Sequence, residues 1–166
     1  FKSTLKGPNH LGRTFRFMLA GNLQIFVGHS RKGERYSGGK VEPADPINWD
    51  SKDTTQYTNG WEKLDVSVDN KKGTVFYRIA KYNPGEHRGE TLGRNSGGVM
   101  WIRNQREIKA GFEKRLFTGN NDTHGLYVEI KFTGDLLDEA INLTTRKDDV
   151  KPGQDLMDKL CEVLRP

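Results

Sequence analysis

The segment Val128–Phe132 (VEIKF) has the acid-x-lysine form found on strands of metal-dependent nucleases. In such a site a carboxylate, here Glu129, holds Mg²⁺, and a lysine, here Lys131, positions water. The second acid is poorly placed, because Asp122 lies only seven residues earlier, across a turn. An alternating strand with Glu129 and Lys131 on its solvent face explains the same residues, and we prefer that interpretation.

Other groups that could bind a metal or act as a nucleophile are scattered along the chain. The four histidines are His10, His29, His87 and His124. They share no HxxxH spacing, and Cys161 is the single cysteine, so the sequence predicts no metal site and no intramolecular disulfide. No serine lies in a GxSxG elbow, and GRNSGG at 93–98 lacks the Gly-Lys-Ser ending of a phosphate loop.

Two cations, Arg146 and Lys147, lie in the polar segment 143–152 (LTTRKDDVKP), between two expected helices. A lysine on a loop can reach several ångströms and neutralise a phosphate as a point charge. Composition alone favours a solvated lysine at this position.

Length and composition restrict the class of protein. The 166 residues suit one domain, and the apolar share of 33% with 19 glycines is ordinary for a globular chain. No apolar stretch approaches the roughly 18 residues of a membrane span, and the first residues lack the apolar core of a signal peptide. We therefore expect a cytoplasmic protein without a membrane partner. Because the chain begins at Phe1 without methionine, we expect a domain excised from a longer protein.

The net charge of +5 permits a nucleic-acid partner such as DNA. The cations expected to contact phosphates lie on the polar run 29–40: Arg31, Lys32, Arg35 and Lys40. A basic nucleic-acid-binding module is therefore one interpretation of the chain, and a Mg²⁺-dependent nuclease is a less favoured one.

The patterning predicts helices at the ends and strands between them. Leu11, Phe15, Met18 and Leu19 have the spacing of one buried helix face, which ends at Gly21. Alternation predicts a strand over 23–28, then a loop over 29–40, an extended path over 41–49 and a polar surface excursion over 50–60.

The clearest local prediction is a hairpin of strands 64–68 and 75–79 with its turn at 69–73. A loop over 83–98, strands over 99–102 and 126–132 and short helical turns over 135–141 follow. A last helix begins at Pro152, with a buried face of Leu156, Leu160, Val163 and Leu164. This order predicts an α+β fold with a mixed or mostly antiparallel sheet packed with helices.

Four segments, in order, resemble the second, transducer domain of the GHKL ATPases. They are HLGRTFRFMLAGNLQIFVG, KVEPADPIN, GVMWIRNQREI and GLYVEIKFTGDLLDEAINLTTRKDDVKP. The superfamily includes gyrase B subunits, MutL proteins, heat-shock chaperones and microrchidia proteins, and this chain is most similar to bacterial chaperone-like, MutL-like and microrchidia-like members. The matching positions are Asp45-Pro46, the Arg103-Asn104-x-Arg106-x-Ile108 turn, Leu137-Asp138 and Lys147.

The resemblance implies a single transducer domain over 1–166, with a helix over 1–21 that leads in from an N-terminal ATP-binding domain of the same chain. It also implies the fold of domain two of ribosomal small-subunit protein five, with a left-handed βαβ crossover. By position, Lys147, with its neighbour Arg146, would reach the γ-phosphate of ATP and relay the nucleotide state to downstream segments or to a homodimer partner.

The parent protein would then be an ATP hydrolase that uses ATP and Mg²⁺. The asparagine box, the DxGxG motif and the glycine-rich lid of the ATP-binding domain are missing from these residues. We therefore expect the isolated chain to be no enzyme and to bind no cofactor.

Overall fold

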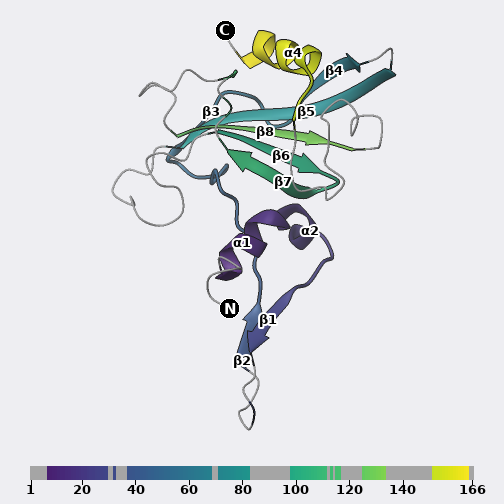
Figure 1. Cartoon of the computed structure of the whole chain (residues 1–166). Coiled ribbons are helices and arrows are strands. Elements are labelled where there is room, and N and C mark those ends of the chain that lie inside the picture. The colour runs from purple at the N-terminus through teal and green to yellow at the C-terminus, as the bar shows by residue number, and fades with distance from the viewer. Residues whose placement is uncertain are drawn as a thin grey trace. The chain divides into compact units, whose positions relative to one another are not determined.

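The computed structural model describes residues 7–29, 32, 37–68, 71–82, 98–111, 113, 115–116, 125–133 and 151–164. The chain divides into two compact units, Phe1–Pro46 and Ile47–Pro166 (Figure 1). Each unit has its own secondary structure, and the prediction of one domain over 1–166 stays a prediction.

The first unit opens with two consecutive helices, α1 (Gly7–Thr14) and α2 (Arg16–Ala20). Phe15 separates them with φ −108° and ψ 16°, yet its N–H donates to the Leu11 carbonyl at 3.0 Å and its carbonyl accepts from Leu19 N–H at 2.8 Å. The helix predicted from the spacing of apolar residues is therefore present, with a local distortion at Phe15. Its expected core face is half-buried rather than fully buried.

A two-stranded antiparallel ribbon follows, built from β1 (Phe26–His29) and β2 (Ser37–Lys40). The ladder continues through the Val41 N–H, which donates to the Ile25 carbonyl at 2.8 Å. The prediction of a loop over 29–40 is wrong for 37–40, because the sequence SGGK carries no alternation that marks a strand. Backbone pairing with β1 makes the strand, not side-chain patterning.

The return segment after β2 runs against α1. The Ala44 N–H donates to the Gly12 carbonyl at 3.2 Å, and a Cβ at Gly12 would lie 2.3 Å from the Glu42 carbonyl oxygen. Only glycine allows this close approach of two backbones.

The second unit is a six-stranded mixed sheet with the order β3-β5-β8-β6-β7, in which β4 also pairs with β5. The strands are β3 (Thr54–Gln56), β4 (Glu62–Val68), β5 (Lys71–Tyr82), β6 (Gly98–Arg103), β7 (Arg106–Gly111) and β8 (Leu126–Phe132). The β6–β8 pair is parallel and the other pairs are antiparallel. The long strand β5 therefore holds β3 and β4 along one edge and β8 along the other.

Two tight connections set the register. Val68 pairs with Lys71, so the predicted β4–β5 hairpin is confirmed, but β5 begins two residues before the expected end of the turn at Gly73. Arg103 pairs with Arg106 across a two-residue turn in which Asn104 and Gln105 have φ of 46° and 67°. Positive φ at both positions is the geometry that matches the twist of a hairpin.

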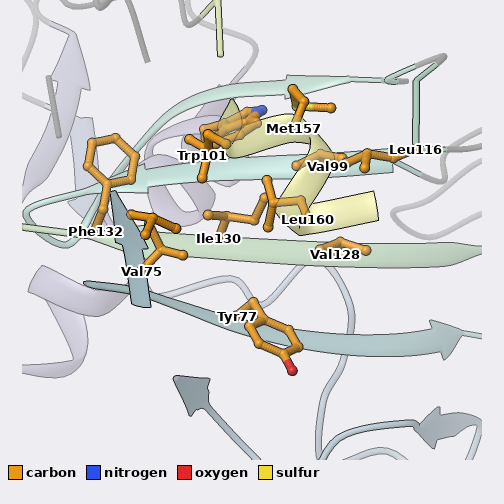
Figure 2. Packing of buried hydrophobic residues seen from close by; sticks show 12 residues of the cluster. Val75, Tyr77, Val99, Trp101, Leu116, Val128, Ile130, Phe132, Met157 and Leu160 are labelled. Carbon is orange, nitrogen blue, oxygen red and sulfur yellow. The ribbon is translucent and has the colours of Figure 1, made fainter. Parts of the chain in front are cut away.

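One face of the sheet packs against helix α4 (Gln154–Leu164), which begins two residues after Pro152. Figure 2 shows Leu160 and Met157 of α4 over Trp101, Val128 and Ile130 of the central strands. The buried members of this cluster are Val66, Val75, Tyr77, Val99, Trp101, Leu116, Val128, Ile130, Phe132, Leu156, Met157 and Leu160. The predicted helix face is confirmed at Leu156 and Leu160, while Val163 and Leu164 are half-buried at its margin.

The opposite face holds a second buried cluster of Ile47, Ala80, Met100 and Tyr127, with Trp49 and Tyr82 packed beside it. The central strands are thus buried on both sides, and β6 has five buried residues in succession. This arrangement is the α+β fold with a mixed sheet that the element order predicts.

Four other predictions have different outcomes. The polar excursion 50–60 is exposed or half-buried apart from Thr58, as predicted, but it also contains strand β3, which pairs with β5 and was not predicted. The predicted loop over 83–98, apart from Gly98, and the helical turns over 135–141 lie outside the described residues. The left-handed crossover stays a prediction. Among the described helices, none is long and apolar enough to cross a membrane.

Candidate functional site

A buried ion pair lies on the face of the sheet opposite α4. Arg78 of β5 and Glu129 of β8 are register partners, and the Arg78 Nε donates to the Glu129 carboxylate. The Glu129 side chain has no exposed surface, and that of Arg78 is 10% exposed. A charge pair taken this far out of water must be held in fixed geometry to offset its desolvation.

Two aromatic rings lie against the guanidinium of Arg78. The Arg78 Cζ lies 4.4 Å from the centroid of the Trp49 ring and 4.9 Å from that of Trp61. Lys131 follows Glu129 on the same face of β8. Its Nζ lies 4.2 Å from the centroid of the Trp61 ring and 5.7 Å from that of the Phe76 ring. We call Trp49, Arg78, Trp61, Lys131 and Phe76 the cation–aromatic row, since cations and rings alternate along it.

The surroundings of Lys131 in this row lower the pKa of its ammonium group. Burial lowers the pKa of Lys131, and the positive charge of Arg78 lowers it further, while the Glu129 carboxylate acts in the opposite direction. The Lys131 ammonium thus lies near the positive charge of Arg78, while the aromatic rings and the negative charge of Glu129 stabilise it there. Cation–π contacts of this kind contribute about 0.5–2 kcal/mol each, depending on desolvation.

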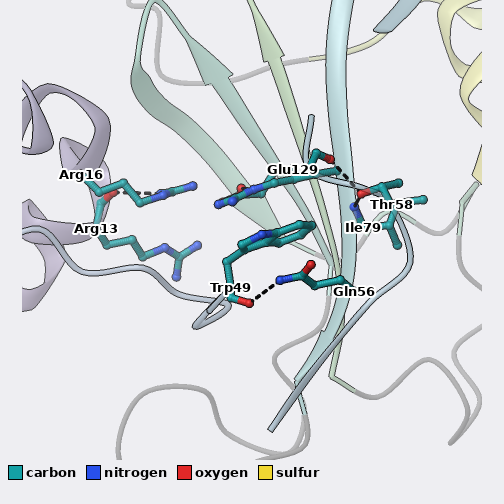
Figure 3. A network of polar contacts seen from close by, with 9 residues as sticks. Arg13, Arg16, Trp49, Gln56, Thr58, Ile79 and Glu129 are labelled. Atoms are coloured by element: carbon teal, nitrogen blue, oxygen red, sulfur yellow. Dashed lines mark hydrogen bonds and ion pairs between the residues drawn. The ribbon is translucent and has the colours of Figure 1, made fainter. Parts of the chain in front are cut away.

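Hydrogen bonds hold the segment between Trp49 and Trp61 against β5. Figure 3 shows the Gln56 side-chain amide donating to the Trp49 carbonyl, at 2.9 Å, and the Ile79 N–H donating to the Thr58 hydroxyl, at 3.1 Å. The Tyr57 N–H also donates to the Ile79 carbonyl at 2.9 Å. The predicted polar excursion is therefore attached to β5, the strand that carries Arg78.

These contacts bear directly on the acid-x-lysine segment. The prediction that Glu129 lies on a solvent face is wrong, because β8 is a central strand with both faces covered. Its carboxylate is engaged by Arg78 instead of being presented to a metal ion. Asp122, the other acid considered for a nuclease site, lies outside the described residues. Within the part of the chain that the structure describes, no three His, Cys, Asp or Glu side chains gather as a metal site.

Sequence reasoning missed Arg78, Trp49 and Trp61 as members of one constellation. A signal was present: Arg78 alternates with Phe76 and Ala80 on a strand whose other face is apolar as well. A lone cation between apolar neighbours indicates a buried charge that needs a partner.

The predicted phosphate contacts fall on the β1–β2 ribbon of the first unit. Register pairs run from Phe26↔Lys40 to His29↔Ser37, so residues 30–36 connect the two strands. Lys32 is exposed, and Lys40 is 46% exposed with Glu42 at 4.0 Å. Phe26, opposite Lys40, is 64% exposed. Arg31 and Arg35 belong to the same connection and lie outside the described residues.

The charge of the chain is divided unequally between the units. Residues 1–46 contain eight lysines and arginines against three acids, a net charge of +5. Residues 47–166 contain 19 of each sign, a net charge of zero. The whole excess of positive charge therefore belongs to the first unit, which the overall composition does not reveal.

Some of the remaining predicted residues lie outside the described residues, and the others lie within them. Lys147, Arg146 and Leu137-Asp138 lie outside the described residues. Asp45-Pro46 ends the first unit, and the arginine-asparagine motif forms the β6–β7 turn, as the resemblance implies.

Comparisons with known proteins give a distant likeness to a solved structure. No protein-family model matches the sequence, and no curated protein matches it. Among solved structures, the chain is similar to the B-subunit of the DNA gyrase from Myxococcus xanthus, with 12% sequence identity and a TM-score of 0.42. The likeness covers 95% of this chain and 49% of that chain, so this chain spans about half the length of the gyrase subunit.

Proposed function

We propose that this chain is a transducer-type domain of a GHKL ATPase, which senses ATP bound by a separate domain and passes that state to other segments. The observation that carries the proposal is the order of the four motif segments, together with the elements on which they fall. The first spans α1, α2 and β1, the third forms the β6–β7 hairpin, and the fourth begins with β8.

The proposed sensor is Lys147, with Arg146 beside it. A cation that contacts only the triphosphate gives the two domains different contact energies in the ATP and ADP states. A difference of that kind is the requirement for a nucleotide-dependent switch. The ATP and Mg²⁺ would be held by the ATP-binding domain, so the residues of this chain contribute charge at one phosphate and no general base.

Turnover of the full-length protein tests the sensor. With saturating ATP, we expect Lys147→Ala to lower turnover at least about tenfold, which corresponds to roughly 1.4 kcal/mol of transition-state stabilisation. Lys151→Ala is the matched control, because Lys151 is an exposed lysine that precedes α4 and lies off the motif position. The melting temperatures of both variants are measured beside the turnover.

Two results would contradict the proposal. Equal turnover in wild type and Lys147→Ala removes the sensor, and equal losses at both lysines reduce the effect to general electrostatics. A gene that encodes no DxGxG-containing ATP-binding domain next to these residues removes the assignment to the ATPase class itself.

A second function, non-specific nucleic-acid binding, is favoured by one observation: the first unit carries the entire net charge of +5. Lys40 pairs in register with Phe26, whose side chain is exposed, and in the sequence Arg31, Lys32 and Arg35 lie between the two strands. Cations at the end of a two-stranded ribbon can follow a phosphate backbone, and a neighbouring aromatic ring can pack on sugars or bases.

Salt dependence tests this second function. We expect duplex DNA to bind with a dissociation constant in the micromolar range or weaker, and the affinity to fall with salt at a slope of about −0.9 per phosphate neutralised. Replacing Arg31, Lys32 and Arg35 with alanine should reduce the slope by about 3. The control removes three exposed lysines of the neutral unit, Lys52, Lys72 and Lys151. Salt-independent binding, or equal slopes in both triple variants, contradicts the ribbon as the site.

A further inference from the structure

Phe26 is the most exposed large apolar side chain among the described residues, at 64%. It lies on β1 between Ile25 and Val27, which are both half-buried. Successive side chains of a strand point to opposite faces, so Ile25 and Val27 share one face of the β1–β2 ribbon and Phe26 stands on the other. We call this second side the Phe26 face.

The Phe26 face carries a cation and a step without side chains. Lys40 is directly opposite Phe26 in the register, and the next pair on the same face is Gly28 with Gly38. Directly opposed residues have Cβ atoms about 4.5–5.5 Å apart, and the next pair on one face lies about 7 Å along the strands. Because glycine has no side chain, the backbone of both strands is uncovered by side chains of their own at this step, beside the ring.

The positions of Phe26 and Lys40 are set by the ladder on both sides of them. Pairing continues to His29↔Ser37 in one direction, and in the other the Val41 N–H donates to the Ile25 carbonyl at 2.8 Å. The Lys40 Nζ lies 4.0 Å from a Glu42 carboxylate oxygen, and the two side chains are 46% and 71% exposed. An ion pair this long and this exposed is weak, so the Lys40 ammonium can exchange it for a phosphate.

The charge near the ring indicates the kind of partner. From Phe26 to Lys40 the sequence contains four lysines and arginines against one acid, Glu34. The first unit as a whole has a net charge of +5. A second copy of this chain would bring the same positive charge to the Phe26 face and is disfavoured, whereas a polyanion is favoured.

An exposed aromatic ring distinguishes a single strand from a duplex. In a duplex each base is stacked between neighbouring base pairs, whereas a base of a single strand can turn outward and stack on an aromatic side chain. Neutralisation of phosphates by lysine and arginine acts on both forms. A ring that stacks on a base therefore adds affinity for the single-stranded form alone.

We propose that the β1–β2 ribbon binds single-stranded nucleic acid in preference to duplex, with a base stacked on Phe26 beside the Gly28–Gly38 step and a phosphate contacting Lys40. The inference rests on the second proposed function, nucleic-acid binding by the first unit, and adds the form of nucleic acid that is bound. Phenylalanine has no hydrogen-bonding group in its side chain, so this contact accepts any base.

Fluorescence anisotropy tests the inference with the whole chain, a labelled oligothymidine and a labelled duplex of the same length at one low salt concentration. We expect the single strand to bind at least about fivefold more tightly than the duplex, because one stacked base has at least that effect. Phe26→Leu keeps an apolar side chain and removes the flat ring. It should weaken single-strand binding at least about fivefold and keep the duplex affinity within about twofold.

Two further variants serve as controls. Phe26→Tyr keeps the aromatic face, so its affinity for the single strand should stay within about twofold of wild type. Tyr57→Leu is the matched control, because Tyr57 is 59% exposed and belongs to the second unit, whose net charge is zero. Both of its affinities should also stay within about twofold of wild type.

The outcomes separate this inference from the function on which it rests. Absence of salt-dependent binding to either form removes nucleic-acid binding and the inference with it. Equal affinities for both forms, weakened by the triple change at Arg31, Lys32 and Arg35 but not by Phe26→Leu, leave the charge-based function and overturn the preference. Equal losses for both forms in Phe26→Leu overturn it as well. Tighter binding to phosphatidylserine–phosphatidylcholine vesicles than to the single strand, lost in Phe26→Leu, would assign the ring to a membrane surface and overturn the inference.

Discussion

Removing Arg78 should destabilise the second unit more than neutralising its partner Glu129. In Arg78→Met the Glu129 carboxylate, which has no exposed surface, loses its guanidinium partner. Breaking a buried pair from one side costs about 3–5 kcal/mol, because the remaining buried charge loses its hydrogen-bonded counter-ion. The same change also removes the cation that contacts two indole rings, at 4.4 and 4.9 Å.

Glu129→Gln leaves the guanidinium in place. The two rings continue to stabilise its charge, and the glutamine carbonyl can accept the Nε hydrogen bond in a side chain of nearly the same shape. We therefore expect a smaller loss, about 1–3 kcal/mol. The structure predicts this order because the cation of the pair has aromatic neighbours and 10% exposure, whereas the anion has no exposed surface.

The double variant Arg78→Met with Glu129→Gln completes a thermodynamic cycle. It buries no unpaired charge, so its loss should be less than the sum of the single losses by at least about 1.5 kcal/mol. Urea unfolding followed by far-ultraviolet circular dichroism measures each free energy without relying on the tryptophans that line the pair. Lys131→Met serves as the control for removing a cation from the row.

Two outcomes would refute this reasoning. Additive losses would mean that the two side chains do not interact in solution. A larger loss in Glu129→Gln than in Arg78→Met would mean that the aromatic rings do not stabilise the guanidinium. Since a domain of this size is stable by about 5–15 kcal/mol, the expected differences lie well within what urea unfolding resolves.

Three further changes test the packing of the second unit. Leu160→Ala should cost about 2–5 kcal/mol in unfolding free energy, because Leu160 has no exposed surface, and an unchanged urea midpoint would contradict its place in the core. Burial and then the 2.7 Å hydrogen bond to Glu62 raise the pKa of Tyr77 to about 12, above the roughly 10 of an unfolded tyrosine. The stability due to the neutral phenol is thus full below about pH 10 and lost as pH rises through 12, so the difference between wild type and Tyr77→Phe should shrink across that window. Gln105→Gly should add about 0.5–1 kcal/mol, because φ of 67° is strained for glutamine, and a loss in the urea midpoint would show that its side chain makes a compensating contact.

The elements best predicted from sequence are those whose pattern and local chemistry agree. The β4–β5 hairpin combines alternation on both strands with a turn-forming sequence, and α4 has a helical spacing of leucines that the sheet then covers. Both depend on contacts near in sequence or on one clearly apolar face. The strand Ser37–Lys40 shows the opposite case, since its glycines and serine carry no pattern and its pairing with β1 alone makes it a strand.

The site depends on contacts distant in sequence and was therefore harder to predict. Arg78 and Glu129 are 51 residues apart, and Trp49 reaches them through a segment that has no pattern of its own. Each residue taken singly has an ordinary explanation as a surface group. The register of β5 against β8 is what brings them together, and sequence periodicity does not specify which strands become neighbours.

The error at Glu129 has a general physical cause. Alternation of apolar and charged residues predicts a solvent-facing side only when the strand has one covered face. β8 lies between β5 and β6, with α4 and its cluster on one side and a second cluster on the other. A charge at an alternating position of such a strand must be paired, and the cation that pairs with it must come from a neighbouring strand. Arg78, flanked by Phe76 and Ala80 on the adjacent strand, meets both conditions. Each of the two charges, Arg78 and Glu129, therefore supplies the buried partner that the other requires. Their pairing identifies β5 and β8 as neighbouring strands.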